Sequence, residues 1–167
     1  MVEAMLRHEL DARQVSAIVT SAGTVSAGQP ASDEVLELLK ARGLDGAAHR
    51  SAVLDRVAIT DADLVIGMAR EHVRAVSMEV PGAFARTFTL KELVRRGTQA
   101  GPRREDEALA DWLARVGVDR EPRRLLGSSP DDDVADPVGR RFKVFKRMAV
   151  ELDDLVPAAV ALAYPPG

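Results

Sequence analysis

A chain of 167 residues, 46% of them hydrophobic, is long enough to bury one core, and we expect a single domain spanning residues 1–167. A net charge of −3 and few aromatic residues argue against a nucleic-acid partner. The longest apolar stretch, residues 155–164, is too short to span a bilayer and no signal peptide precedes it, so we expect a cytoplasmic protein without a membrane partner. The sequence has no cysteine, which excludes disulfides, cysteine-ligated zinc and a thiolate nucleophile within these 167 residues.

The first part of the chain predicts a helix, a strand, a loop and a second helix. Apolar residues recur at helical spacing over residues 2–12, although nothing caps the start of this helix. A β-branched, apolar run at residues 15–20 then gives way to small residues at 21–28, before Ser32 opens a helix that Gly43 ends. This order is typical of a parallel α/β sheet, in which ligands bind beyond the carboxyl ends of the strands. Residues 21–28 are therefore expected at a functional edge.

The middle of the chain predicts two more strands. Residues 63–68 form a continuous apolar run, which indicates a buried strand, and residues 69–76 follow it as a short helix. Residues 84–88 alternate between apolar and polar, which favours a less buried strand at the edge of the sheet. The chain therefore supplies about three strands in all.

Helix signals dominate the region after these strands. Thr89 and Glu92 have the spacing of a capping box for a helix over residues 90–96, which Gly97 is expected to stop. Polar residues 98–104 then read as a loop.

Two further helices are predicted towards the end of the chain. Pro102 suits the first turn of a helix that ends at Gly117, with Trp112 as a packing anchor. A long amphipathic helix over residues 140–156 should end or kink at Pro157.

Two polar loops carry side chains that could bind a ligand. His49 and Arg50 are either a solvated surface pair or, at the rim of a parallel sheet, two side chains that help to position an anion. The acidic residues 131–136 favour a solvated turn. A calcium loop is the weaker reading, because the alternating oxygen ligands and terminal glutamate of an EF-hand are missing. We expect no metal site and no cofactor.

Taken together, these pieces resemble the low-molecular-weight protein tyrosine phosphatase family over essentially the whole chain, and actinobacterial-type members most. The resemblance implies a three-layer α/β/α fold with a parallel sheet of about three remaining strands and the central first strand missing. The matching stretches occur in the family's order, at residues 3–6, 21–24 with 28–30, 49–51, 62–68 and 133–137.

The resemblance also assigns roles to particular residues. In the family, a cysteine separated by five residues from an arginine attacks the phosphorus of a phosphotyrosine-type monoester, and an aspartic acid protonates the leaving group. Asp136 matches that general acid, while Ser21 and His49 match positions that brace the phosphate loop. Val138 stands where many relatives have an aromatic residue. Met1 aligns just after the catalytic loop, so the domain is expected to be N-terminally truncated, with no nucleophile, and inactive as given.

Two functional hypotheses follow. In the first, the natural product begins upstream of Met1, carries the cysteine loop and acts on phosphorylated proteins or small phosphomonoesters. In the second, the protein is a non-catalytic pseudophosphatase that binds a protein or phosphate-bearing partner. An arsenate reductase is disfavoured, because it needs redox cysteines. Without its central strand the domain should be marginally stable, unless residues 15–20 pair directly with residues 63–68.

Overall fold

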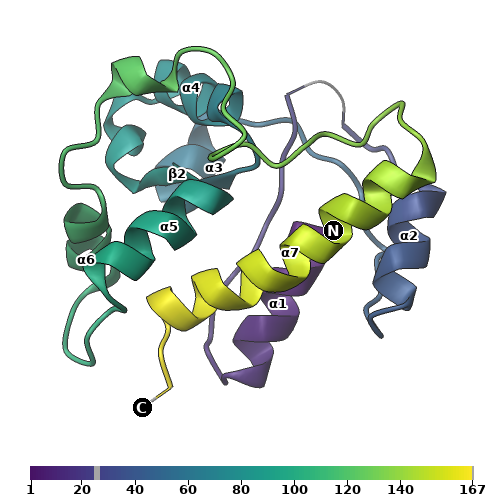
Figure 1. Ribbon diagram of the computed structural model, residues 1–167, viewed down its shortest axis with the longest axis horizontal. Helices are drawn as coiled ribbons and strands as arrows, with labels where there is room; N and C mark the ends of the chain where they lie inside the picture. Colours follow the sequence, from purple (N-terminus) through teal and green to yellow (C-terminus); the bar gives the residue numbers. More distant parts are fainter. Residues whose placement is uncertain (25–26, 167) are drawn as a thin grey trace. The chain divides into compact units, whose positions relative to one another are not determined.

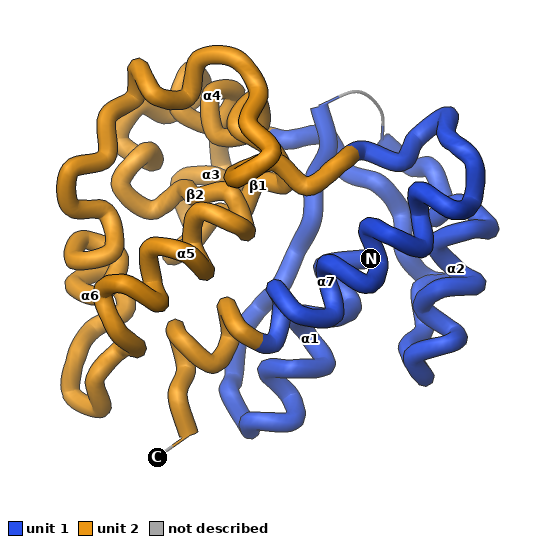
Figure 2. The backbone as a smooth tube through the Cα atoms, in the orientation of Figure 1, with its two compact units in different colours: residues 1–54, 136–157 blue, residues 55–135, 158–167 orange. Residues whose placement is uncertain are grey.

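The computed structural model describes residues 1–24 and 27–166 (Figure 1). The chain divides into two compact units, drawn in blue and orange in Figure 2. Unit 1 comprises Met1–Leu54 and Asp136–Pro157, and unit 2 comprises Asp55–Ala135 and Ala158–Gly167. Within the described residues, no helix is both long and apolar enough to cross a bilayer.

Unit 1 is built from helices. It contains α1 (Val2–Ala12), α2 (Asp33–Lys40) and most of α7 (Phe142–Ala163). Leu38, Phe145 and Ala149 form a small core, against which three partly buried side chains pack. The predicted helices α1 and α2 are confirmed, and Gly43 adopts the left-handed conformation (φ +71°) expected of a residue that closes a helix.

The predicted buried strand at residues 15–20 is wrong. The segment belongs to no described strand, and the side chain of Ile18 is 96% exposed. An apolar segment becomes a buried strand only when neighbouring strands take its backbone hydrogen bonds and its two faces are covered. Outside this segment, a single parallel bridge joins Gly23 to Val53 in the described part of unit 1. Of the small residues 21–28, Val25 and Ser26 lie outside the described residues.

Unit 2 contains the sheet. Strand β1 (Val65–Gly67) pairs in parallel with β2 (Thr87–Thr89), with Ile66 opposite Phe88. The parallel α/β class is confirmed, but the described sheet has two strands instead of about three, and residues 15–20 do not pair with β1. The helices of this unit are α3 (Arg56–Asp61), α4 (Arg70–Glu79), α5 (Leu90–Ala100) and α6 (Leu109–Val116), with 3-10 turns η1 (Pro81–Arg86) and η2 (Pro122–Leu125).

Strand β2 is fully buried, which contradicts the less buried strand predicted from its alternating pattern. Its two threonines are satisfied locally instead of facing water. Thr87 Oγ1 donates to the carbonyl of Ala83 at 2.7 Å, and Thr89 Oγ1 accepts from the backbone N–H of Glu92 at 3.1 Å. The second contact confirms that Thr89 caps α5.

The helix end predicted at Gly97 is wrong, and the helix that contains Pro157 does not end there. Helix α5 continues past Gly97 to Ala100, because this glycine lies against other side chains instead of closing the helix. A Cβ atom at residue 97 would lie 3.1 Å from Leu162 Cδ1 and 3.3 Å from Trp112 Cζ2. Pro157 lies inside α7, which continues to Ala163 although the proline has no N–H to donate.

Helix α6 begins at Leu109, so Pro102 is not part of its first turn. Its packing anchor is as predicted: Trp112 is fully buried, and its indole N–H donates to the carbonyl of Gly101 at 3.0 Å. Helix α3 was not predicted. Asp55 begins it by accepting the N–H of Ala58 at 2.9 Å, a capping pattern present in the sequence.

Candidate functional site

Asp136 is exposed and lies on the Asp-Pro turn that leads into α7, in unit 1. Its Oδ1 accepts the backbone N–H of Val138 at 2.9 Å, the geometry of an Asx turn. The turn holds the carboxyl group in place through one of its oxygens and leaves the group accessible to solvent. Such a carboxyl group can exchange protons with a ligand or with water.

Ser21 and His49 converge on one carboxylate. Ser21 Oγ donates to Glu3 Oε2, and His49 Nδ1 lies 3.4 Å from the same oxygen. The two supporting residues named by the resemblance are therefore brought together, from segments 28 residues apart, by the first turn of α1. In the described part of the chain, no hydrogen bond or ion pair joins Asp136 to this group.

Glu3 is the site residue that sequence reasoning missed. Its Oε1 pairs with Arg7 Nη2 at 2.6 Å, one helical turn along α1. Arg7 also donates to the carbonyl of Val19, so the same guanidinium holds the extended segment that precedes Ser21. The i to i+4 spacing of Glu3 and Arg7 was a readable signal for their pairing, but not for their contacts with residues 19, 21 and 49.

The loop at residues 49–51 is tied to the small-residue loop. Ser51 N–H donates to the carbonyl of Gln29 at 2.8 Å, and Gly28 N–H donates to the carbonyl of Ser51 at 2.7 Å. Arg50 folds back on its own loop, with Nη1 donating to the carbonyls of Ala47 and His49. Of the pair considered for anion binding, Arg50 is thus an exposed loop residue, while His49 faces Glu3.

The acidic stretch that precedes Asp136 belongs to unit 2 and is not the solvated turn expected from the sequence. Asp133 Oδ1 accepts the N–H of Arg70, the first residue of α4, at 2.8 Å, and its Oδ2 accepts the N–H of Ser129 at 2.7 Å. Val134 N–H donates to the carbonyl of Met68 at 2.8 Å. These bonds fasten the stretch to the end of β1. Among the described residues, no cluster of three or more histidine or acidic side chains could hold a metal ion.

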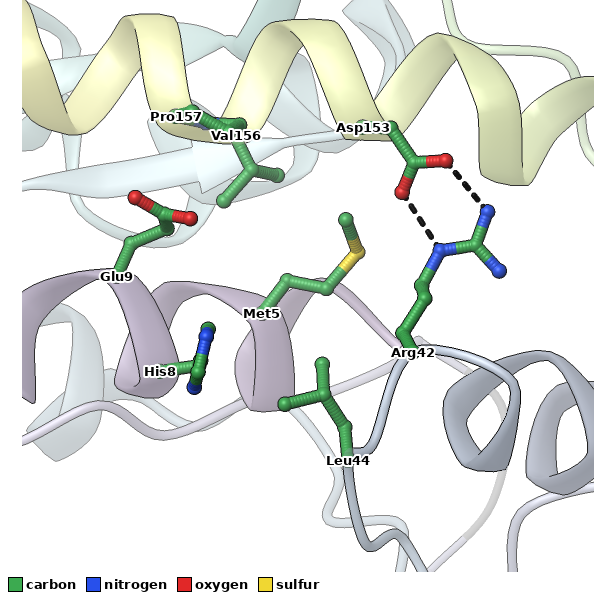
Figure 3. Close-up of a pocket in the computed structure, with 8 residues that line it drawn as sticks. All are labelled: Met5, His8, Glu9, Arg42, Leu44, Asp153, Val156 and Pro157. Atoms are coloured by element: carbon green, nitrogen blue, oxygen red, sulfur yellow. Dashed lines mark hydrogen bonds and ion pairs between the residues drawn. The ribbon is translucent and has the colours of Figure 1, made fainter. Parts of the chain in front are cut away.

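A cavity of about 150 Å³ in unit 1 lies between α1, α7 and the turn after α2 (Figure 3). Met5, Leu44 and Val156 supply its apolar wall. Arg42 Nε and Nη2 donate to the two carboxylate oxygens of Asp153 at 2.6 Å each, and this paired hydrogen bond raises the pKa of Arg42. Because the two charges satisfy one another, the cavity offers no free charge from this pair to a ligand.

Comparison with known proteins gives a consistent result. Residues 1–103 match the family described as low molecular weight phosphotyrosine protein phosphatase. The chain is 30% identical over 139 residues to a protein-arginine-phosphatase of Geobacillus stearothermophilus, covering 83% of this chain and 71% of that protein.

Two solved structures extend the likeness. A low molecular weight protein tyrosine phosphatase from T. tengcongensis is similar with a TM-score of 0.69 and 27% identity, over 95% of this chain and 86% of that one. The YwlE arginine phosphatase from Geobacillus stearothermophilus is similar with a TM-score of 0.64 and 25% identity, over 94% of this chain and 79% of that one.

Proposed function

Because this chain belongs to the low molecular weight phosphotyrosine protein phosphatase family, we propose that it is the larger part of a phosphatase that hydrolyses phosphomonoesters. The observation that carries the proposal is the Asp-Pro turn, which presents the carboxyl group of Asp136 to solvent with one oxygen held by Val138 N–H. The 167 residues contain no cysteine, so in this proposal the nucleophile lies upstream of Met1.

The proposed chemistry gives Asp136 two tasks. As the cysteine thiolate attacks phosphorus, the bond to the leaving oxygen breaks and protonated Asp136 donates its proton to that oxygen. The resulting carboxylate then takes a proton from the water that attacks the cysteinyl-phosphate, which releases phosphate and the thiolate. Ser21 and His49 are proposed to brace the loop that holds the phosphate, and their shared contact with Glu3 supports a common place for both side chains.

The substrate has two candidates. Phosphotyrosine follows from the family, in which a ring beside the Asp-Pro turn would flank the phenyl group. Here the exposed Val138 occupies that position, and one relative is named a protein-arginine-phosphatase. Phosphoarginine, which is a phosphoramidate and not a phosphomonoester, is therefore the second candidate. Its hydrolysis also needs a proton on the departing nitrogen, which Asp136 can supply in the same role.

The experiment begins with the intact mass of the protein made by its source cell, compared with 18.0 kDa for these residues. We expect a heavier product that hydrolyses phosphotyrosine or phosphoarginine, with the ratio of the two kcat/KM values identifying the substrate. Asp136→Asn should lower kcat about 10²- to 10⁴-fold. Asp131→Asn, which changes an exposed carboxylate of the same acidic stretch, should leave kcat nearly unchanged.

Two results would contradict the proposal. A mass of 18.0 kDa without activity would favour the non-catalytic pseudophosphatase, whose binding partner would then be sought among phosphorylated proteins. Turnover by the purified 167-residue polypeptide that Asp136→Asn abolishes would show that the nucleophile is not an upstream cysteine.

A further inference from the structure

Unit 2 contains a cavity of about 100 Å³ whose wall is dominated by arginine. Three carboxylates, Glu92, Glu121 and Asp132, also line it. Five guanidinium groups therefore face three carboxylates, which leaves a formal excess of two positive charges around the cavity. The arginines are Arg70, Arg95, Arg96, Arg120 and Arg124.

The carboxylate of Asp132 is already shared by two of these arginines. Its Oδ2 accepts from Arg70 Nε at 2.9 Å and from Arg70 Nη2 at 2.7 Å, and its Oδ1 accepts from Arg95 Nη2 at 2.7 Å. Asp132 is buried, so it cannot turn to neutralise further cations.

Glu92 is committed in the same way. Its two oxygens accept from Arg120 Nε at 2.9 Å and Nη2 at 3.0 Å, and Arg120 is also stacked on the rings of Phe84 and Phe88. Arg96 Nε lies 3.2 Å from the same carboxylate, yet this buried N–H makes no hydrogen bond in the structure. The guanidinium of Arg96 is held beside the cavity by its Nη1, which donates to the carbonyl of Val118 at 3.0 Å.

The cavity mouth carries donors in excess. Arg95 is 45% exposed, and the one side-chain hydrogen bond described for it goes to Asp132. Arg124 is 72% exposed and lies 3.4 Å from Glu121, whose carboxylate already accepts two hydrogen bonds from Arg123. Exposed guanidinium groups that have donors to spare bind phosphate oxygens well, because their planar donors match two oxygens at once.

Size and charge select the ligand. At about 30 Å³ per water molecule, the cavity has room for about three waters, which suits a phosphoryl group. A phosphate monoester carries about −1.5 to −2 charges near pH 7, which offsets the excess of two positive charges. A single carboxylate offsets half of it. We propose that this cavity binds a phosphoryl group, from inorganic phosphate or from a phosphomonoester, through Arg95 and Arg124 at its mouth.

This site goes beyond the proposed function, since none of its residues is Asp136, Ser21, His49 or a member of the Asp-Pro turn. The test is a phosphorus NMR titration of the 167-residue chain with inorganic phosphate at constant ionic strength, repeated with phosphoserine and, by competition, with acetate. Saturable binding of inorganic phosphate or phosphoserine is expected, and the tighter of the two identifies the source. Acetate should compete weakly.

The variants locate the binding. Arg95→Gln with Arg124→Gln should weaken phosphate binding about tenfold or more, because it removes two charged donors. Arg104→Gln is the matched control: Arg104 is likewise an exposed arginine of unit 2 but does not line the cavity, and this variant should bind phosphate as the parent chain does. Arg124→Gln alone leaves both buried carboxylates paired, so it answers the question if the double variant does not fold.

The proposal is overturned if phosphate does not saturate, if acetate competes as well as phosphoserine, or if the cavity variants and Arg104→Gln bind phosphate equally. Because the 167-residue chain is used and no turnover is measured, this outcome is independent of whether the protein is a phosphatase.

Discussion

Similar apolar sequences adopt different structures in the two units of this protein. In unit 2, the apolar run that forms β1 has β2 as a parallel neighbour, and the residues of β2 are completely buried. In unit 1, the equally β-branched run at residues 15–20 has no strand partner in the described chain, and Ile18 faces solvent. A strand is thus specified jointly by its own pattern and by a neighbour that accepts its hydrogen bonds.

Hydrogen exchange should give the largest contrast. Amides of β1 and β2 should exchange about 10⁴-fold more slowly than those of residues 16–20, because opening a buried sheet costs about 5 kcal/mol or more while an unpaired segment opens at almost no cost. Amide exchange followed by mass spectrometry measures both. Slow exchange throughout residues 16–20 would show that this segment is as protected as the strands of unit 2, contrary to the prediction.

Truncating one side chain in each region tests the same contrast through the free energy of unfolding. Phe88→Ala should lower the free energy of unfolding by about 3–5 kcal/mol, since it opens a cavity beneath β2. Ile18→Ala, which truncates an aliphatic side chain at an exposed position, should change that free energy by less than about 0.5 kcal/mol. Urea unfolding checks the pair, and equal costs would mean that residues 15–20 are buried in solution.

The ion pairs of unit 2 predict a dependence on pH. Burial acts to raise the pKa of Asp132, but the hydrogen bonds from Arg95 and Arg70 outweigh it and hold that pKa below its ordinary value. A carboxyl group with a lowered native pKa stabilises the fold above its unfolded pKa of about 3.9, and this stabilisation is lost as the pH falls through the native pKa.

Asp132→Asn should therefore cost roughly 2 kcal/mol near pH 7, less than a fully buried pair because Arg95 is partly exposed. The difference from the parent chain should shrink as the pH falls below about 4. Urea unfolding at several pH values measures it, with Asp131→Asn as the exposed control. A difference that stays constant down to about pH 2 would show that charge is not its cause.

The smallest effect is expected in unit 1. Glu3→Gln weakens the contacts with Arg7, Ser21 and His49, but these lie near solvent, so the cost should be at most about 1 kcal/mol. Glu9→Gln on the same helix should cost nothing measurable. A loss well above 1 kcal/mol for Glu3→Gln alone would make this network a main support of unit 1.

Local patterns were sufficient for much of the fold. The cap at Thr89 and the anchor at Trp112 depend on neighbours a few residues away or on apolar periodicity, both of which can be read directly. Gly97 could not be read correctly, because its reason is a close approach to Leu162, 65 residues on. Likewise, the polar side chains of Thr87 and Thr89 suggested an exposed face of the strand, but both hydroxyls make hydrogen bonds inside the protein.

The candidate site also combines residues that the sequence indicated with residues that only long-range contacts bring together. Asp136, Ser21 and His49 were named by resemblance; the structure places the last two beside Glu3, and the role of each stays a proposal. Glu3 was missed because its partners come from residues 21 and 49, and no local rule brings these segments together. The sharing of Asp132 by Arg70 and Arg95 was equally out of reach, since the three residues belong to separate elements.

The position of Trp112 has a practical consequence for spectroscopy. The sequence has one tryptophan and one tyrosine, and both Trp112 and Tyr164 belong to unit 2. With Trp112 fully buried, the intrinsic fluorescence of the protein is an optical reporter of unit 2, whereas far-ultraviolet circular dichroism records the helices of both units. Melting curves from the two signals that fail to coincide would reveal the units unfolding in separate steps.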